Sequence, residues 1–203
     1  MSNVEQNKEV VLRQLPPSHN VHRVLGQRDL VVTHATVRDR GVPAAVTFDL
    51  WRLANGKVVE HWGNQEPWVE RTANGHSQVD GVTSIDASAS TDAAQKVVEA
   101  TVKTILVAND FSSVSSYLAG EDYIQHNPRF ADGISGLAAA LKALAEKGTT
   151  MKYSEVLHYV AEGDFGYAYS LGHFAGAEFV FHDLFRVAGG RATEHWDVMV
   201  PRK

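Results

Sequence analysis

Hydrophobic and polar residues alternate in short runs over two separate stretches of the chain, and turn residues divide the runs. In the first stretch, residues 21–62, the turns are "GQRD", "RDRGVP" and "ANGK"; in the second, residues 156–196, they are "AEGD", "FAGAE" and "AGGR". Glycine in such turns supplies the positive φ that a two-residue hairpin needs. The pattern therefore predicts two antiparallel β-meanders.

The two meanders repeat one another. "DLWRLANGKVVEHW" (49–62) and "DLFRVAGGRATEHW" (183–196) are identical at eight of fourteen positions, where average residue usage would give about one by chance. A weaker match precedes it, between "VHRVLGQRDLVV" from Val21 and "VLHYVAEGDFGY" from Val156. We interpret this pattern as an internal duplication.

The segments before the two meanders differ. Before the second, apolar residues in "STDAAQKVVEATVKTILVAND" recur at helical spacing behind a Ser90/Thr91 cap, which predicts an amphipathic helix. A short helix over 111–118, a short strand in "YIQHNP" and an Ala/Leu-rich helix ending at Gly148 follow. Before the first meander only "SNVEQNKEVVLRQL" predicts a helix, so this copy is incomplete.

These differences predict three parts. Residues 1–82 form a partial, mostly β repeat, residues 83–90 form a linker, and residues 91–203 form a nearly complete domain. The stretch 71–90 is rich in Gly, Ser, Asn and Asp, so we expect a connecting tail with little structure.

Composition narrows the classes of function. The chain has 203 residues, 44% of them hydrophobic and 21% charged, which is ordinary for a globular protein. A net charge of −5 without clustered cations argues against nucleic acid as a partner. No apolar run is long enough for a membrane span, and no secretory signal is visible, so we expect a cytoplasmic protein without a membrane partner.

The order of helix, "YIQHNP" (Tyr123 to Pro128), helix, "VAEGD" and "DLFRVAGGRATEHWDV" resembles the SnoaL-like polyketide cyclase branch of the nuclear transport factor 2-like superfamily. The resemblance covers 91–203 and, as a β half, 21–82. It implies an α+β fold of the cystatin-like type, in which a curved antiparallel sheet wraps around helices as a cone and leaves an apolar pocket.

The resemblance also implies how the copies pair. Members of this family commonly dimerise by packing sheet against sheet, and a tandem chain can satisfy the same need within one polypeptide. We therefore predict an intrachain pseudo-dimer in which the first meander packs on the second. A further homodimer, or a domain swap that brings a helix to the first meander, stays open.

The candidate chemistry lies at the end of the second copy. His195 and Asp197 are two apart on a strand and share a face. A two-residue turn at Gly189 and Gly190 would set Asp197 opposite His182 and make a patch of His182, His195 and Asp197. Burial in an apolar cone raises the pKa of an aspartate, which makes it a better base for a proton α to a carbonyl.

The first copy lacks two of these groups, because it has Phe48 in place of His182 and Gly63 in place of Asp197. It keeps Asp49, Glu60, His61 and Trp62. We interpret the first copy as a scaffold and the second as the copy that carries the site.

Four further residues are candidates for contact with a ligand. By the resemblance, His126 at the end of "YIQHNP" would face the cavity mouth and orient a carbonyl or carboxylate. Tyr123 is three residues away and is expected to face away from His126. Asp183 and Trp196 recur in the first copy as Asp49 and Trp62, which favours structural roles, although both could contact substrate.

These observations lead to one hypothesis for the function and one alternative. The first is a small enzyme, free of metal and of organic cofactor, that catalyses proton transfer, aldol-type cyclisation or isomerisation of an apolar carbonyl compound, with Asp197, His126 and His195 as catalytic residues. The rival is a non-catalytic module of the same fold that binds a ligand or another protein.

Overall fold

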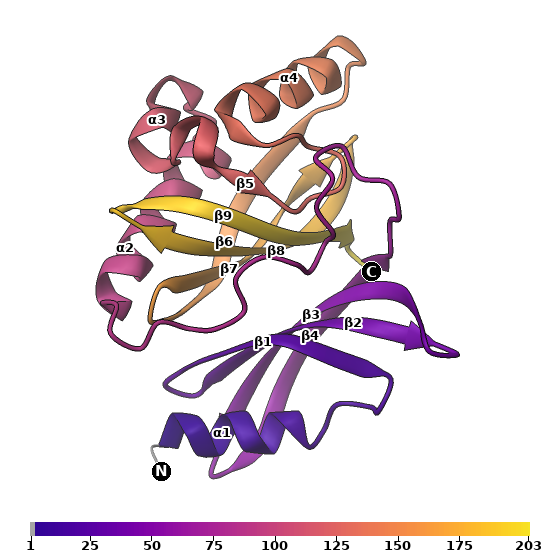
Figure 1. Cartoon of the computed structure of the whole chain (residues 1–203), viewed down its shortest axis with the longest axis vertical. Helices are drawn as coiled ribbons and strands as arrows, with labels where there is room; N and C mark the ends of the chain where they lie inside the picture. Colours follow the sequence, from indigo (N-terminus) through magenta and orange to yellow (C-terminus); the bar gives the residue numbers. More distant parts are fainter. Residues whose placement is uncertain (1–2) are drawn as a thin grey trace.

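The first half of the chain forms a four-stranded antiparallel sheet, whose strands follow one another in the order β1-β2-β3-β4. The computed structural model describes residues 3–203. Helix α1 (Asn3–Leu12) lies under this sheet (Figure 1). The strands are β1 (His19–Gln27), β2 (Leu30–Asp39), β3 (Val42–Ala54) and β4 (Lys57–Pro67).

The second half forms a five-stranded sheet in the order β5-β9-β8-β7-β6. Strands β6 to β9 are an antiparallel meander, and β5 joins its edge in parallel with β9. The strands are β5 (Ile124–Gln125), β6 (Met151–Glu162), β7 (Phe165–Phe174), β8 (Ala177–Ala188) and β9 (Arg191–Pro201).

Helices cover the outer face of the second sheet (Figure 1). The predicted amphipathic helix is present, and the Ser90 hydroxyl caps it by accepting a hydrogen bond from the Ala93 amide. Val98 from this helix and Val102 from the turn that follows it pack on Ala168 and Phe185 of the sheet. The elements are α2 (Thr91–Thr101), the π-helical turn η1 (Val102–Val107), the 3-10 turns η2 (Phe111–Ser113) and η3 (Gly120–Asp122), α3 (Val114–Tyr117) and α4 (Gly133–Glu146). Within the described residues, no helix is long and apolar enough to cross a bilayer.

The predicted α+β architecture is confirmed: a curved antiparallel sheet and the helices on it form a cone, and a second, smaller sheet lies beside it. The two sheets pack face to face between the two helical layers (Figure 1). One apolar core joins them, and it includes Phe48 and Leu50 from the first sheet and Tyr167, Leu184 and Trp196 from the second. The sheet-on-sheet contact predicted within one chain is therefore present.

The pairing of β8 with β9 corrects the predicted register. Gly189 and Gly190 form the expected turn, with Ala188 paired to Arg191. A β-bulge between Arg186 and Val187 then shifts the register by one residue. Because of that shift, Asp197 lies opposite Asp183, and the expected pairing of Asp197 with His182 is wrong.

The first meander carries the same irregularity. Strands β3 and β4 have a bulge between Arg52 and Leu53, and Asp49 lies opposite Gly63. The two meanders therefore present corresponding residues on corresponding faces.

Residues 68–90, which we call the strap, run from β4 past β5 and back to α2 (Figure 1). As expected they contain no helix or strand, but they are firmly held. The buried Arg23 guanidinium donates hydrogen bonds to the carbonyls of Val79, Asp80 and Val82 and lies 3.9 Å from the centre of the Trp196 ring. One cation thus fixes the strap to both sheets.

We predict that Arg23→Met lowers the free energy of unfolding by about 3 kcal/mol, because three strap carbonyls lose a charged donor. Denaturant unfolding measures this loss, and hydrogen exchange should show faster exchange in the strap than in the sheets. Arg38→Met is the control, since Arg38 binds an exposed carbonyl, that of Gly41. Unchanged exchange in the strap of the Arg23 variant would contradict the role assigned to this side chain.

Candidate functional site

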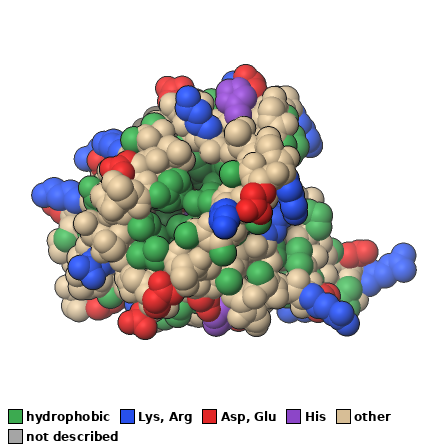
Figure 2. All heavy atoms as spheres, turned by 90° about the horizontal axis from the view of Figure 1, so that it is seen from above, with side chains coloured by type: hydrophobic (Ala, Val, Ile, Leu, Met, Phe, Trp, Pro, Cys, Tyr) green, Lys and Arg blue, Asp and Glu red, His purple; other side chains and the backbone are tan. Residues whose placement is uncertain are grey.

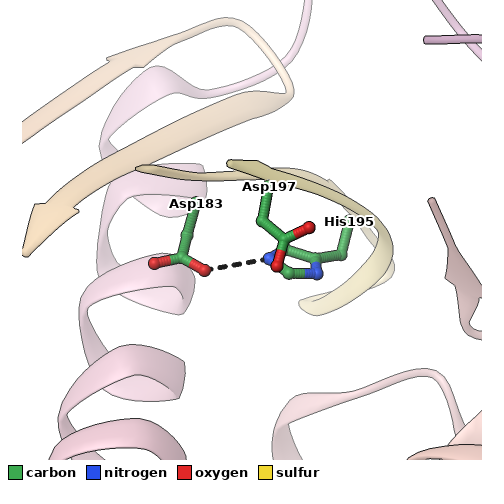
Figure 3. Close-up of side chains that lie close together, drawn as sticks. All are labelled: Asp183, His195 and Asp197. Atoms are coloured by element: carbon green, nitrogen blue, oxygen red, sulfur yellow. Dashed lines mark hydrogen bonds and ion pairs between the residues drawn. The ribbon is translucent and has the colours of Figure 1, made fainter. Parts of the chain in front are cut away.

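Three titratable side chains meet on the helix-covered face of the second sheet (Figure 3). Asp183 lies on β8, and His195 and Asp197 lie on β9. One ligating atom from each lies within 4.8 Å of the others. Strand alternation places them there, because the opposite face of both strands is used for the contact with the first sheet.

Hydrogen bonds fix the imidazole of His195. Its Nδ1 lies 2.9 Å from the side-chain oxygen of Gln125, which also accepts the backbone N–H of Asn127. That oxygen is an acceptor, so Nδ1 is the donor. The Nε2 atom faces Asp183 Oδ1 at 3.1 Å (Figure 3). A second proton must therefore lie between His195 and Asp183.

The Asp183 carboxyl group is buried and only half satisfied. Its Oδ1 also accepts a hydrogen bond of 3.0 Å from the Tyr153 hydroxyl. Its Oδ2 is buried without a partner among the described residues. Burial, and the charges of the two aspartates, raise the pKa of both Tyr153 and Tyr123 well above the usual value, so both phenols are neutral donors.

Asp197 presents a free oxygen to the interior. Its Oδ2 accepts a hydrogen bond of 2.8 Å from the side-chain amide of Asn127. Its Oδ1 is buried and has no partner in the part of the chain that the structure describes. Burial raises the pKa of this carboxyl group, the His195 charge lowers it, and the Asp183 charge raises it further. The carboxylate is consequently a stronger base than one in water.

The cavity at these groups is small, with a volume of about 50 Å³. Its polar end holds Asp183, His195 and Asp197, and the rest of its wall is mostly apolar and includes Tyr123, Ile105, Leu118, Phe130 and Leu137.

A larger hollow of about 670 Å³ lies next to the cavity, between α4 and the segment that contains η2 and α3. Hydrophobic side chains line a hollow on the face seen in Figure 2. Leu137 and Met151 line both spaces. These two side chains therefore lie where the outer hollow meets the inner cavity.

The structure brings some of the residues predicted to form the site together and places the others elsewhere. Asp183, His195 and Asp197 lie together, and Tyr123 lines the same cavity. His182 lies on the opposite face, where its ring nitrogens bind the Tyr167 hydroxyl at 2.6 Å and the Asn64 side chain at 2.9 Å. Burial there lowers the pKa of His182 to about 3, so this histidine is a neutral part of the sheet interface.

Trp196 and His126 also lie away from the cavity. Trp196 is fully buried in the core between the sheets, and His126 stacks on it with ring centres 4.7 Å apart. The nitrogens of His126 face the Ser77 carbonyl, Asp80 and Glu194. The prediction that His126 faces the cavity mouth is wrong, because β5 turns alternate residues to opposite sides and the strap covers His126.

Residues that the sequence reasoning missed complete the site. Gln125 and Asn127 orient His195 and Asp197, and Tyr153 holds Asp183. Period-two alternation from Tyr123 would have placed Gln125 and Asn127 on one face. No local signal pointed to Tyr153, because β6 reaches Asp183 only through tertiary folding.

The donor set of Asp183, His195 and Asp197 also fits a divalent cation that prefers oxygen and imidazole ligands. Such an ion would replace the proton shared by His195 Nε2 and Asp183, since Nδ1 is already bound to Gln125. The three residues can hold an ion or act as acid and base.

The charge of Asp197 acts on Glu66 of the first sheet across the contact between β4 and β9. Glu66 is 5% exposed, and its nearest cationic group is Arg129, at 3.8 Å. Burial, followed by the Asp197 charge, raises the pKa of Glu66 to about 8. A carboxyl group of the first sheet therefore interacts electrostatically with Asp197 of the second sheet.

Comparison with known proteins finds similar solved structures. No protein-family model matches the sequence, and no curated protein matches it. Similar solved structures include TsrD from Streptomyces laurentii (23% identity over 54% of this chain and 90% of that chain, TM-score 0.43) and an epoxide hydrolase, described as LEH-like, from M. tuberculosis (22%, 54% and 84%, TM-score 0.44). A SnoaL-like polyketide cyclase from Agrobacterium tumefaciens is also similar (14%, 53% and 91%, TM-score 0.41). Each of these likenesses covers about half of this chain.

We predict that Glu66→Gln stabilises the protein, because folding no longer has to bury a charge or take up a proton. The folded-state pKa is raised, so the native glutamate loses stability as pH rises from about 4.5 to about 8. The gain from the substitution should be near zero at pH 4, grow across this window, and reach at least about 1 kcal/mol above it. Thermal unfolding at several pH values measures the gain.

Glu60→Gln is the matched control, because Glu60 is exposed and pairs with Arg52. It should cost a few tenths of a kcal/mol without the same dependence on pH. A gain for Glu66→Gln that does not change between pH 4 and pH 9 would show that Glu66 is not protonated on folding.

Proposed function

We propose that this protein catalyses proton transfer at the carbon next to the carbonyl of a small apolar compound, with Asp197 as the base. The observation that carries this proposal is the free, buried Oδ1 of Asp197 beside a second carboxyl group and a fixed imidazole. A base in such a place is desolvated, oriented and close to a proton donor, which are the requirements of general acid–base catalysis.

The reaction starts when Asp197 Oδ1 removes the α-proton and the electrons move to the carbonyl oxygen. The resulting enolate needs a hydrogen-bond donor. The proton shared by His195 and Asp183 lies at the same end of the cavity and meets this need. Return of the proton from Asp197 to another carbon gives an isomer, whereas attack of the enolate on a second carbonyl of the substrate gives a ring.

The shape of the interior favours a substrate with an apolar body. The inner cavity of about 50 Å³ admits only the reacting group, since ordinary ligand pockets measure roughly 300–1,000 Å³. The outer hollow of about 670 Å³ has the size for the remaining atoms. Leu137 and Met151 lie between them, so entry of a substrate requires these side chains to move.

One observation favours the alternative, a module that binds a ligand without reaction. Side chains fill most of the cone and leave the cavity small, and a ligand could bind in the outer hollow without reaching Asp197. The two functions differ in whether chemistry at Asp197 accompanies binding.

A carbon acid distinguishes them. We predict that the protein accelerates exchange of the α-protons of 1-phenylpropan-2-one in heavy water, followed by NMR, and that Asp197→Asn lowers this acceleration at least 100-fold. Asp92→Asn, on the exposed side of α2, should keep it. If Asp197→Asn exchanges as fast as the native protein while the ketone still binds, Asp197 is not the base and the binding module is favoured.

A further inference from the structure

The first sheet holds an acid–base pair of its own. His61 Nε2 lies 2.7 Å from Asp49 Oδ1, and these residues correspond in the repeat to His195 and Asp183. The other oxygen of Asp49 accepts a hydrogen bond of 2.9 Å from the Thr47 hydroxyl. Asp49 is buried, whereas 41% of the His61 side chain is exposed. The carboxylate is thus fixed inside and the imidazole reaches out.

The imidazole is fixed in a plane and has one nitrogen free. Its ring stacks on Trp51, with centres 3.6 Å apart and an angle of 9°. Because Nε2 faces a carboxylate, it carries the proton, and Nδ1 has the lone pair. No described residue binds Nδ1. A neutral imidazole whose N–H is held by aspartate is a good nucleophile and base at its other nitrogen.

Gly63 keeps this pair intact. A Cβ atom at Gly63 would overlap Asp49 Oδ1 and lie 2.8 Å from His61 Nε2, so any side chain there must displace one of them. The first copy has Gly63 where the second copy has Asp197. The first copy therefore holds a pair of residues that is open to solvent, whereas the second copy holds three enclosed groups.

The pair opens into a groove of about 790 Å³ between the edge of the first sheet and the far end of the second. Thr47, Asp49, His61 and Gln65 line it on one side. The other side has an apolar part from the β7–β8 hairpin and the end of β9, which lies beside the first sheet in Figure 1. The apolar wall is formed by Phe174, Phe179, Met199 and Pro201.

The outer face of the first sheet explains why this groove exists. Helix α1 covers Val31, Trp51 and Leu53, and no described helix covers the other end, which carries Thr47 and Asp49. In the second sheet α2 and its neighbours enclose the corresponding region.

We propose that the groove is a second site, which binds esters with a short apolar acyl chain and cleaves them at His61. Nδ1 attacks the acyl carbon, the C–O bond breaks, and the alkoxide or phenolate leaves with the electron pair. The acyl-imidazolium keeps its Nε2–H on Asp49. Water then adds to the acyl carbon and the bond from the acyl carbon to Nδ1 breaks. The carboxylic acid departs with one proton of the water, the other proton goes to the released alkoxide or phenolate, and the neutral imidazole is restored. The apolar wall would hold the acyl chain, and Asp49 positions the ring.

The test uses 4-nitrophenyl hexanoate and the full chain. The native protein should hydrolyse it at least tenfold faster than His61→Gln, and mass spectrometry of quenched reactions should find the acyl group on the peptide that contains His61. Asp49→Asn should lower kcat with KM nearly unchanged, because it disturbs the ring and not the groove. Gly63→Ala should lose activity as His61→Gln does.

His173→Gln is the matched control, since His173 is an exposed histidine on β7 outside the groove, and it should keep the native rate. Equal rates for the native protein and His61→Gln, with both folded by circular dichroism, would overturn the proposal. So would an acyl group that accumulates on other histidines and not on His61.

Discussion

The packing of the first sheet on the second is the constraint on which the rest of the structure depends. It takes up one face of each sheet, with Phe48 and Leu50 on one side and Leu184 and Trp196 on the other. Because side chains alternate along a strand, the opposite faces are then fixed as well. His195 and Asp197 must face the helices once Trp196 is committed to the core. The same commitment makes His182 a neutral hydrogen-bonding residue of the interface, in spite of its place next to Asp183.

The two outer faces differ in what covers them, and this difference sets their chemistry. Helices enclose the second, so Asp197 loses water and its pKa rises. Among the described residues, only α1 lies over the first, at one end, so Asp49 is buried beneath an exposed His61. In the second copy, the repeated pair of strands therefore forms an enclosed site suited to an apolar carbonyl compound. In the first copy, the same pair of strands lines an open groove suited to an ester. The interpretation of the first copy as a scaffold explains its packing against the second sheet. It gives no role to His61 and Asp49.

Much of the fold could be predicted because its signals are local. Turn glycines and period-two alternation indicated the meanders, and helical spacing behind Ser90 indicated α2. The register could not be predicted, because the bulge between Arg186 and Val187 has no distinct local signal and shifts every later pair by one residue. The environment of His126 depends on the strap, which is bound through Arg23, and such long-range contacts are invisible to spacing. The site thus contains Gln125 and Asn127, which the sequence did not suggest, and leaves out His182 and His126, which it did.

The central claim is that Asp197 is a desolvated carboxylate with a free oxygen, and the titration of its side-chain carbon by ¹³C NMR tests this most directly. The resonance is assigned by its absence in Asp197→Asn. Since burial is the largest influence on this group, the account predicts a midpoint clearly above the ordinary value of 3.8. A midpoint at or below that value would show a solvated carboxylate and would contradict the account.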